Sequence, residues 1–123
     1  MNIVCGTDIV EIARIKRAIE RKGEKFLKKI YTENEIEYCE SRKNVKYERY
    51  AGRFAGKEAL YKALKSIKAE NNITWKDVEI VREKTGKPKI NFINKEFNEI
   101  NCIDISISHC KEYAVSNVVI ITK

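Results

Sequence analysis

The chain has 123 residues, of which 43% are hydrophobic and 35% are charged, and its formal net charge is +7. This length fits one domain, and the apolar content is sufficient for a folded core, which argues against disorder. The positive charge favours an anionic partner, such as a nucleic acid, an acidic protein or a phosphorylated small molecule, although a basic surface without a special partner has the same composition.

The sequence shows no sign of membrane insertion or export. No apolar run approaches the roughly 20 residues of a membrane helix, and the N-terminus lacks a secretory signal pattern. We therefore expect a cytoplasmic protein. The four cysteines include no C-x-x-C pair, so a structural zinc site has little support. Cys110 follows His109, the only histidine, and this adjacency leaves a catalytic thiol as an alternative.

The first half of the chain is mainly helical in its pattern. We expect a short buried strand at residues 2–7, and helices at 11–22, from 32 toward 39 and at 47–67. The helix at 11–22 has isoleucines at positions 12, 15 and 19 on one face, and Gly23 suits its C-terminal stop. Residues 32–35 have the form of a capping box. Gly52 and Gly56 lower the helix propensity of 47–67.

The second half changes to the period of strands. We expect strands at residues 75–81, 89–93, 103–108 and 113–122, with a turn at 85–88 and a short helix at 94–100. Residues 103–108 alternate isoleucines with polar side chains, as a half-buried strand does. Helices in the first half followed by strands predict one small α+β domain over 1–123, with the helices packed on an antiparallel sheet.

Asp8 lies between the first expected strand and the first expected helix. A carboxylate at a strand end is well placed to face a cleft and hold a cation. Asp is also a favoured residue for capping a helix N-terminus. The pattern leaves both interpretations open.

The long helix carries charged residues on its apolar side. At about 100° per residue, Arg53 and Lys57 fall within the arc of Tyr50, Phe54, Tyr61 and Leu64, and Glu58 lies at its edge. Such groups are costly to bury unless they are paired or bind an ion. Three cations, including Lys62 one turn beyond Glu58, suit a polyphosphate with a metal on the carboxylate. An ordinary Glu58–Lys62 pair at i,i+4 is the alternative.

Two other functions have weaker support. A Ser-His-Asp hydrolase built from Ser106 or Ser108, His109 and Asp104 is conceivable, but the nucleophile-elbow pattern is absent, as is a Walker phosphate loop. A nucleic-acid-binding module would account for the net charge and the six tyrosines. No nucleic-acid-binding motif accompanies them, so we expect no nucleic-acid partner.

Five short motifs follow one another in a fixed order. They read G-x-D-x-V-E-I from Gly6, F-x-x-K-E-A-x-x-K-A from Phe54, W-x-D-x-E-I from Trp75, G-K-P from Gly86 and S-I-S-H-x-x-x-Y-A-V from Ser106. In this order and spacing they resemble the holo-acyl-carrier-protein synthases, the short type of 4'-phosphopantetheinyl transferase. The resemblance extends from Ile3 to about Ile121.

The resemblance implies a reaction and a metal site. 4'-Phosphopantetheine would pass from coenzyme A to a serine hydroxyl of an apo acyl carrier protein, and adenosine 3',5'-bisphosphate would leave. Asp8 and Glu58 would bind Mg²⁺, and Lys62 would stabilise the charge that develops on the phosphates. Phosphoryl-type transfer depends mainly on positioning and charge neutralisation, which these residue types supply.

The resemblance also implies how substrates are bound. Arg53, Lys57 and Lys62 would contact coenzyme A phosphates, together with the turn Gly86-Lys87-Pro88 and His109 of a neighbouring subunit. Active sites between subunits imply a homotrimer, with the strand at 115–121 as a candidate interface. Arg14 would contact the acidic carrier protein, and Arg17 and Arg21 recur on the same helix face.

The chain departs from the family pattern at two positions. Lys65 stands where the family usually has glycine, which affects close approach of the backbone to coenzyme A. Cys110 stands where the family often has aspartate, so any polar role of that aspartate is lost.

Overall fold

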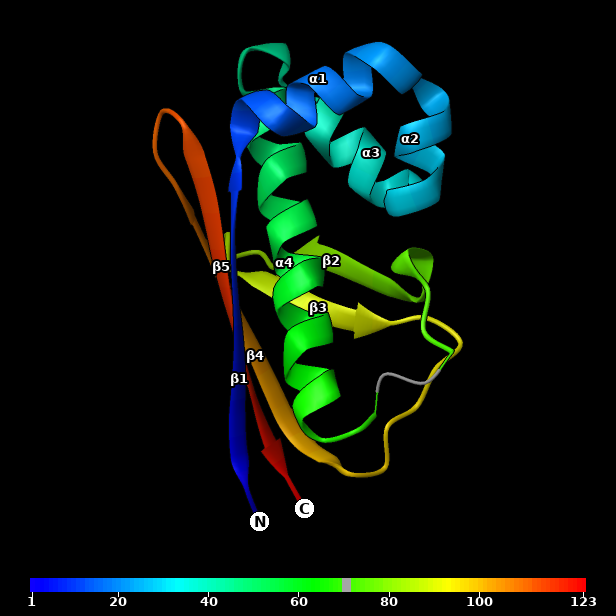
Figure 1. Cartoon of the computed structure of the whole chain (residues 1–123), viewed down its shortest axis with the longest axis vertical. Coiled ribbons are helices and arrows are strands. Elements are labelled where there is room, and N and C mark those ends of the chain that lie inside the picture. Colours follow the sequence, from blue (N-terminus) through cyan, green and yellow to red (C-terminus); the bar gives the residue numbers. More distant parts are fainter. Residues whose placement is uncertain (70–71) are drawn as a thin grey trace.

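The computed structural model describes residues 1–69 and 72–123. Its elements in chain order are β1 (Ile3–Glu11), α1 (Ile12–Lys22), α2 (Glu24–Ile30), α3 (Glu33–Glu40), the 3-10 turn η1 (Lys43–Val45), α4 (Lys46–Ser66), the 3-10 turn η2 (Trp75–Asp77), β2 (Val78–Arg82), β3 (Pro88–Phe92), β4 (Ile100–His109) and β5 (Tyr113–Thr122). Figure 1 shows these elements coloured along the chain.

The strands form two antiparallel sheets beside one long helix. The larger sheet has the order β1-β5-β4, and β2 and β3 form a separate hairpin. Helix α4 runs along one face of the larger sheet, and α1, α2 and α3 gather around its N-terminal half (Figure 1). The predicted α+β class is confirmed. Among the described residues, no helix has both the length and the apolar character needed to cross a membrane.

Local signals explain most of the helix boundaries. The buried side chains of α1 are Ile12, Ile15 and Ile19, and the Gly23 N–H bonds the carbonyl of Ile19 at its end. The Thr32 hydroxyl accepts the N–H of Glu35, and the Glu35 carboxylate accepts the N–H of Thr32, so the predicted capping box is present.

Two expectations of secondary structure were wrong, and one helix was missed. Helix α2 was not anticipated, and the segment expected as a strand from Trp75 begins with the turn η2. Residues 94–99 form a bend, an irregular stretch and a turn instead of a helix, and Ile100 already belongs to β4. Asn94 has φ 57°, a left-handed conformation that an α-helix cannot continue, and the ring of Phe97 packs on Phe92 at 4.8 Å between centroids.

Two glycines allow α4 to lie very close to its neighbours. A Cβ on Gly6 of β1 would collide with the backbone carbonyl oxygen of Ala59, and one on Gly56 of α4 would lie 2.6 Å from Ile80 Cδ1. Only glycine fits at position 6, because the obstacle is backbone, whereas a side chain at position 56 would require the end of the Ile80 side chain to shift. Gly56, which weakens the helix by propensity, therefore contributes to tertiary packing, and Gly6 sets the short distance between β1 and α4.

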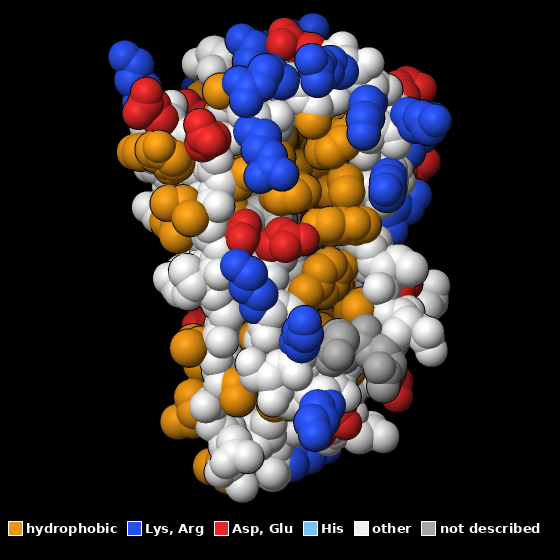
Figure 2. Space-filling view, viewed as in Figure 1, with side chains coloured by type: hydrophobic (Ala, Val, Ile, Leu, Met, Phe, Trp, Pro, Cys, Tyr) orange, Lys and Arg blue, Asp and Glu red, His pale blue; other side chains and the backbone are white. Residues whose placement is uncertain are grey.

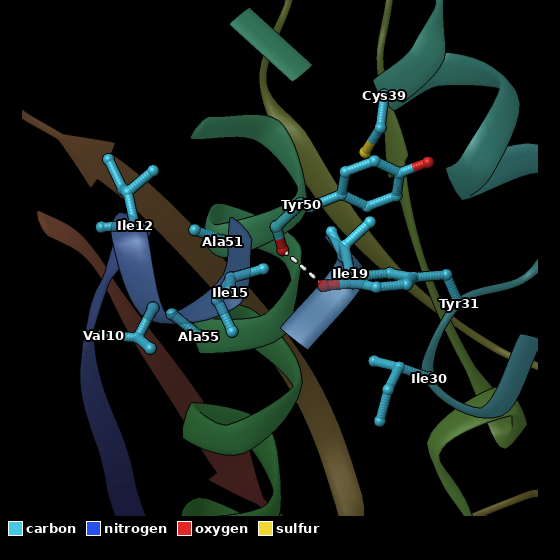
Figure 3. Packing of buried hydrophobic residues seen from close by; sticks show 11 residues of the cluster. Val10, Ile12, Ile15, Ile19, Ile30, Tyr31, Cys39, Tyr50, Ala51 and Ala55 are labelled. Atoms are coloured by element: carbon cyan, nitrogen blue, oxygen red, sulfur yellow. Dashed lines mark hydrogen bonds between the residues drawn. The ribbon is translucent and has the colours of Figure 1, made fainter. Parts of the chain in front are cut away.

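The core consists of two clusters along α4. One lies around the helical end and is drawn in Figure 3, where the Tyr31 hydroxyl donates to the Tyr50 carbonyl over 2.8 Å. The other joins the C-terminal half of α4 to the strands through Leu60, Leu64 and Ile120, each with no exposed surface. The two clusters fix α4 in place, and α4 carries four of the candidate functional residues, Arg53, Lys57, Glu58 and Lys62.

Candidate active site

Asp8 lies within β1, opposite Ser116 of β5, and its side chain faces α4. Helix α1 begins four residues later, and its N-cap is Glu11. Asp8 is therefore not a helix cap. Lys62 Nζ of α4 lies 3.1 Å from Asp8 Oδ1 and donates to the Thr7 carbonyl at 2.9 Å. The alternative pair of Lys62 with Glu58 is not formed.

Glu58 lies beside this pair. Burial raises the pKa of its carboxyl above the ordinary value, the nearby Asp8 carboxylate raises it further, and Lys62 and Arg14 oppose the shift. Two carboxylates from distant parts of the sequence are thus close enough to influence one another. On the face shown in Figure 2, acidic side chains lie at mid-height with basic side chains above and below them.

A shallow pocket of about 300 Å³ adjoins this pair of carboxylates. Glu58, Lys62 and Lys65 line it from α4, together with Tyr61 and Ile73. The Tyr61 hydroxyl donates to the Thr74 carbonyl at 2.7 Å, which fixes that wall. We call this the lysine pocket.

An aromatic group continues the apolar wall of the lysine pocket. The rings of Phe54 and Trp75 stack at 5.3 Å between centroids, and Tyr61 meets Trp75 edge-on at 5.4 Å. Figure 2 shows an apolar band beside the acidic side chains on this face. The carboxylate pair therefore has a charged border on one side and an apolar border on the other.

A second pocket, of about 390 Å³, lies on another side of α4. Its cationic side chains are Arg42, Arg49, Arg53 and Arg82, and it is also lined by Tyr38, Glu48, Gly86, Pro88 and His109. We call it the arginine pocket. Four arginines around one recess suit a phosphorylated ligand, because guanidinium groups bind phosphate oxygens in pairs.

Arg53 is the most informative residue of the arginine pocket. Its side chain is 7% exposed, and its buried Nε has no hydrogen-bond partner among the described residues. The guanidinium groups of Arg53 and Arg49 lie 4.1 and 4.2 Å from the Tyr38 ring centroid. Buried donors are normally satisfied, so this pocket has unused capacity to bind an anion.

His109 lies at the edge of the arginine pocket, with Nδ1 3.7 Å from Glu48 Oε2. Asp104 lies on the opposite face of β4 and accepts a hydrogen bond from Lys87. The Ser-His-Asp hydrolase is therefore not assembled. Cys110 is exposed, and backbone N–H groups of Glu112 and Tyr113 lower the pKa of its thiol, but it lines neither pocket.

Lys57 is placed differently from the expectation. It has no exposed surface, and Nζ donates to the Ile30 carbonyl at 2.8 Å, Glu35 Oε1 at 2.7 Å and the Trp75 carbonyl at 2.9 Å. All three of its protons are used inside the protein. The expected contact of Lys57 with coenzyme A phosphates does not fit this position, and Lys87 also lies outside the arginine pocket.

The two groups of candidate residues flank α4. At about 100° per residue, Arg49 and Glu58 lie on opposite sides of the helix. Asp8 belongs to β1 and His109 to β4, the two edges of the larger sheet, with β5 between them. The structure thus joins Asp8, Glu58 and Lys62 in one place, and Arg53, Gly86, Pro88 and His109 in another.

The basic face of α1 is exposed. Arg14, Arg17 and Arg21 are exposed, opposite the buried isoleucines, and form no ion pair with a described residue. Arg14 also lies close enough to Glu58 to affect its pKa. The Arg14 end of the basic face is therefore the part nearest to the carboxylate pair.

Several pocket residues were not anticipated from the sequence. Tyr38, Arg42, Glu48, Arg49 and Arg82 line the arginine pocket. Arg49 and Arg53 are four residues apart on one helix. This spacing is the only local signal in the sequence that could have predicted that Arg49 belongs to the same site as Arg53. In the described part of the chain, no group of three metal-binding side chains occurs, and the four cysteines are free.

An α+β fold with a carboxylate pair, a lysine and an arginine-lined recess defines a protein that handles phosphorylated ligands. Residues 4–118 match the model of the 4'-phosphopantetheinyl transferase superfamily. The chain is 47% identical to a holo-[acyl-carrier-protein] synthase of Ruminiclostridium cellulolyticum, over 98% of this chain and 92% of the relative. It is 44% identical to the synthase of Chloroherpeton thalassium, over 94% of both chains.

Solved structures agree with these relatives. The holo-[acyl-carrier-protein] synthase of Helicobacter pylori in complex with coenzyme A has a TM-score of 0.82 at 30% identity, covering 95% of this chain and 99% of that one. The synthase of Bacillus anthracis in complex with coenzyme A (3',5'-ADP) has a TM-score of 0.77 at 33% identity, covering 95% and 94%. The chain belongs to the 4'-phosphopantetheinyl transferase superfamily and is an enzyme of the holo-[acyl-carrier-protein] synthase kind.

Proposed function

We propose that residues 1–123 form one transferase domain that moves 4'-phosphopantetheine from coenzyme A to a serine of an apo acyl carrier protein. The serine oxygen forms a bond to the β-phosphorus, the bond from that phosphorus to the bridging oxygen breaks, and adenosine 3',5'-bisphosphate leaves. The observation that carries this proposal is the convergence of Asp8, Glu58 and Lys62 beside an open pocket. The relatives bound to coenzyme A support it.

The carboxylate pair fits a magnesium ion. Burial and the nearby Asp8 carboxylate raise the pKa of Glu58, and a cation between the two carboxylates would relieve both effects. Mg²⁺ takes few protein carboxylates and completes its coordination with water and substrate phosphates. When bound by Asp8 and Glu58, Mg²⁺ would neutralise phosphate charge. The Lys62 ammonium, held at Asp8 and the Thr7 carbonyl, then faces the charge that develops on the phosphates.

The arginine pocket suits the remaining phosphate-bearing part of coenzyme A. Arg53 offers an unpaired buried Nε there, and His109, Gly86 and Pro88 line the same recess. This pocket and the carboxylate pair lie on opposite sides of α4 within one chain. One coenzyme A molecule would therefore contact the carboxylate pair of one subunit and the arginine pocket of its neighbour.

The outer face of the larger sheet is the surface on which such subunits would meet. Ile3 and Ile9 of β1 and Tyr113 and Val119 of β5 are exposed hydrophobic residues. Side chains alternate between the two faces of a strand, so these residues share the face away from α4. Apolar patches of this kind mark association sites. We propose a homotrimer, as the family resemblance implies, located in the cytoplasm.

Mass spectrometry of an apo acyl carrier protein tests the reaction. Incubation with this enzyme, coenzyme A and Mg²⁺ should add the mass of phosphopantetheine, and a carrier whose acceptor serine is replaced by alanine should gain none. Carrier binding without a mass gain would instead indicate a catalytically silent subunit. Salt-sensitive retention on single-stranded DNA, without a response to coenzyme A, would indicate a nucleic-acid-binding module.

A further inference from the structure

Three charged residues of α4 line the lysine pocket in a row. Lys62 follows Glu58 by four residues and Lys65 follows Lys62 by three, so all three project from one side of the helix. At a rise of about 1.5 Å per residue, Lys62 and Lys65 lie about 4.5 Å apart along the helix axis. The pocket thus continues from the carboxylate pair along a line of two ammonium groups.

The two lysines have different surroundings. Lys62 Nζ is held by Asp8 and the Thr7 carbonyl. Lys65 is exposed at the pocket wall and forms no ion pair with a described carboxylate. Its flexible stem can bring the ammonium over the pocket toward Lys62. In the family pattern that this chain resembles, glycine is usual at the position of Lys65.

We propose that Lys65 is a further substrate-binding residue that contacts the diphosphate of coenzyme A. This inference rests on the proposed function. The β-phosphate reacts at Asp8, Glu58 and Lys62, and the α-phosphate is joined to it through one bridging oxygen. A lysine one helical turn beyond Lys62 is within reach of that second phosphate. The positive charge of Lys65 would also stabilise the negative charge that the leaving phosphate gains during transfer.

The location of the lysine pocket favours a small ligand over the carrier protein. Tyr61 and Ile73 form its apolar side, and the Tyr61 hydroxyl is tied to the Thr74 carbonyl. The basic face of α1, where we place the acidic carrier, lies at the opposite end of α4 from Lys65 (Figure 1). A contact between Lys65 and the carrier is the competing explanation, and it predicts a different kinetic effect.

Binding measurements on Lys65→Gln separate these explanations. We expect its Kd for coenzyme A and for dephospho-coenzyme A to rise about five- to tenfold, because a charged hydrogen bond is lost. Adenosine 3'-monophosphate lacks the diphosphate, so its Kd should stay unchanged. Lys65→Arg should retain most of the affinity. Lys68→Gln removes the same charge from an exposed residue outside the pocket and serves as the matched control.

Steady-state kinetics complete the test. The KM for coenzyme A should rise in Lys65→Gln, while the KM for the carrier stays near that of the wild type. Equal coenzyme A affinities for Lys65→Gln and Lys68→Gln would overturn the inference and leave the proposed function intact if the wild type still modifies the carrier. A rise confined to the carrier KM would also overturn it. A wild-type chain that neither binds coenzyme A nor modifies the carrier would overturn both.

Discussion

Lys57 Nζ lies 2.7 Å from Glu35 Oε1 in the interior of the protein, and neither side chain is exposed. The other Glu35 oxygen accepts the N–H of Ile80 at 2.8 Å, so the pair connects α3, α4 and β2. Burial lowers the pKa of Lys57, and the Glu35 carboxylate opposes this shift by favouring the charged form. The pair thus anchors α4 one residue before Glu58.

Removal of one partner should be strongly destabilising. Lys57→Met leaves Glu35 as an uncompensated buried charge, and we expect the free energy of unfolding to fall by about 3–5 kcal/mol. Urea unfolding followed by circular dichroism measures this change. Lys28→Met, at an exposed lysine of α2, should change stability by less than about 0.5 kcal/mol. Equal stabilities of the two variants would show that the buried pair contributes nothing.

Lys57 also shows what the sequence could and could not predict. Its place on the apolar arc of a long helix was evident, but the carboxylate that neutralises it comes from a helix 22 residues away. Spacing alone could not distinguish a buried partner from a bound phosphate. The arginine pocket was missed for a similar reason, because Tyr38, Arg49 and Arg82 come from three different elements. The periodicity of α1, by contrast, was readable, since Ile12, Ile15 and Ile19 are all buried on one face of the helix.

Gly6→Ala should disturb both the fold and the reaction. The new methyl group would collide with the Ala59 carbonyl oxygen, a backbone atom that cannot turn aside. We expect a loss of about 1–3 kcal/mol in stability as β1 moves from α4. Since Asp8 is on β1 and Glu58 on α4, the same movement separates the two carboxylates. Transfer activity should therefore fall even at temperatures where the variant remains folded. Cys5→Ala, at an exposed neighbour, is the control for both measurements.

Val119→Lys should prevent assembly without unfolding the chain. Val119 is exposed on the face of β5 away from α4, so a lysine there is tolerated by the monomer but places a charge at the proposed interface. We expect light scattering to report a monomer, with transfer activity strongly reduced. Asn98→Lys adds the same charge in an exposed loop and should leave the assembly unchanged. A wild-type monomer with full activity would contradict the homotrimer itself.

Charge reversal on α1 should weaken carrier binding. Arg14→Glu and Arg21→Glu each place a negative charge on the basic face, which would repel an acidic carrier, so the carrier KM should rise and its salt dependence should flatten. Arg14 also lowers the pKa of Glu58, so Arg21→Glu isolates the docking effect. Lys123→Glu, at the opposite end of the molecule, is the control (Figure 1). An unchanged carrier KM in both arginine variants would exclude docking on this face.

Glu58→Gln should make the chain more stable and less active. The folded-state pKa of Glu58 is raised above its ordinary value of 4.5, first by burial and then by Asp8. The folded chain therefore holds this proton more tightly than the unfolded chain, and its stability falls as pH rises through the interval above 4.5. Glutamine does not ionise, so Glu58→Gln should not lose stability in this way as pH rises. In metal-free buffer, Glu58→Gln should have a higher Tm than the wild type at pH 7, and the difference should shrink toward pH 4.

Transfer by the same variant should fall by orders of magnitude. If Glu58 and Asp8 hold Mg²⁺ together, loss of either carboxylate removes several kcal/mol of transition-state stabilisation. Asp8→Asn should behave alike in activity, since Asp8 caps no helix and asparagine cannot replace it as an anion. Rates measured across a Mg²⁺ titration, beside thermal unfolding, distinguish a lost ligand from a lost fold. Near-wild-type rates for both variants at every Mg²⁺ concentration would show that the carboxylate pair binds no catalytic metal, and the higher Tm of Glu58→Gln would then reflect only the removal of a buried charge and of its repulsion by Asp8.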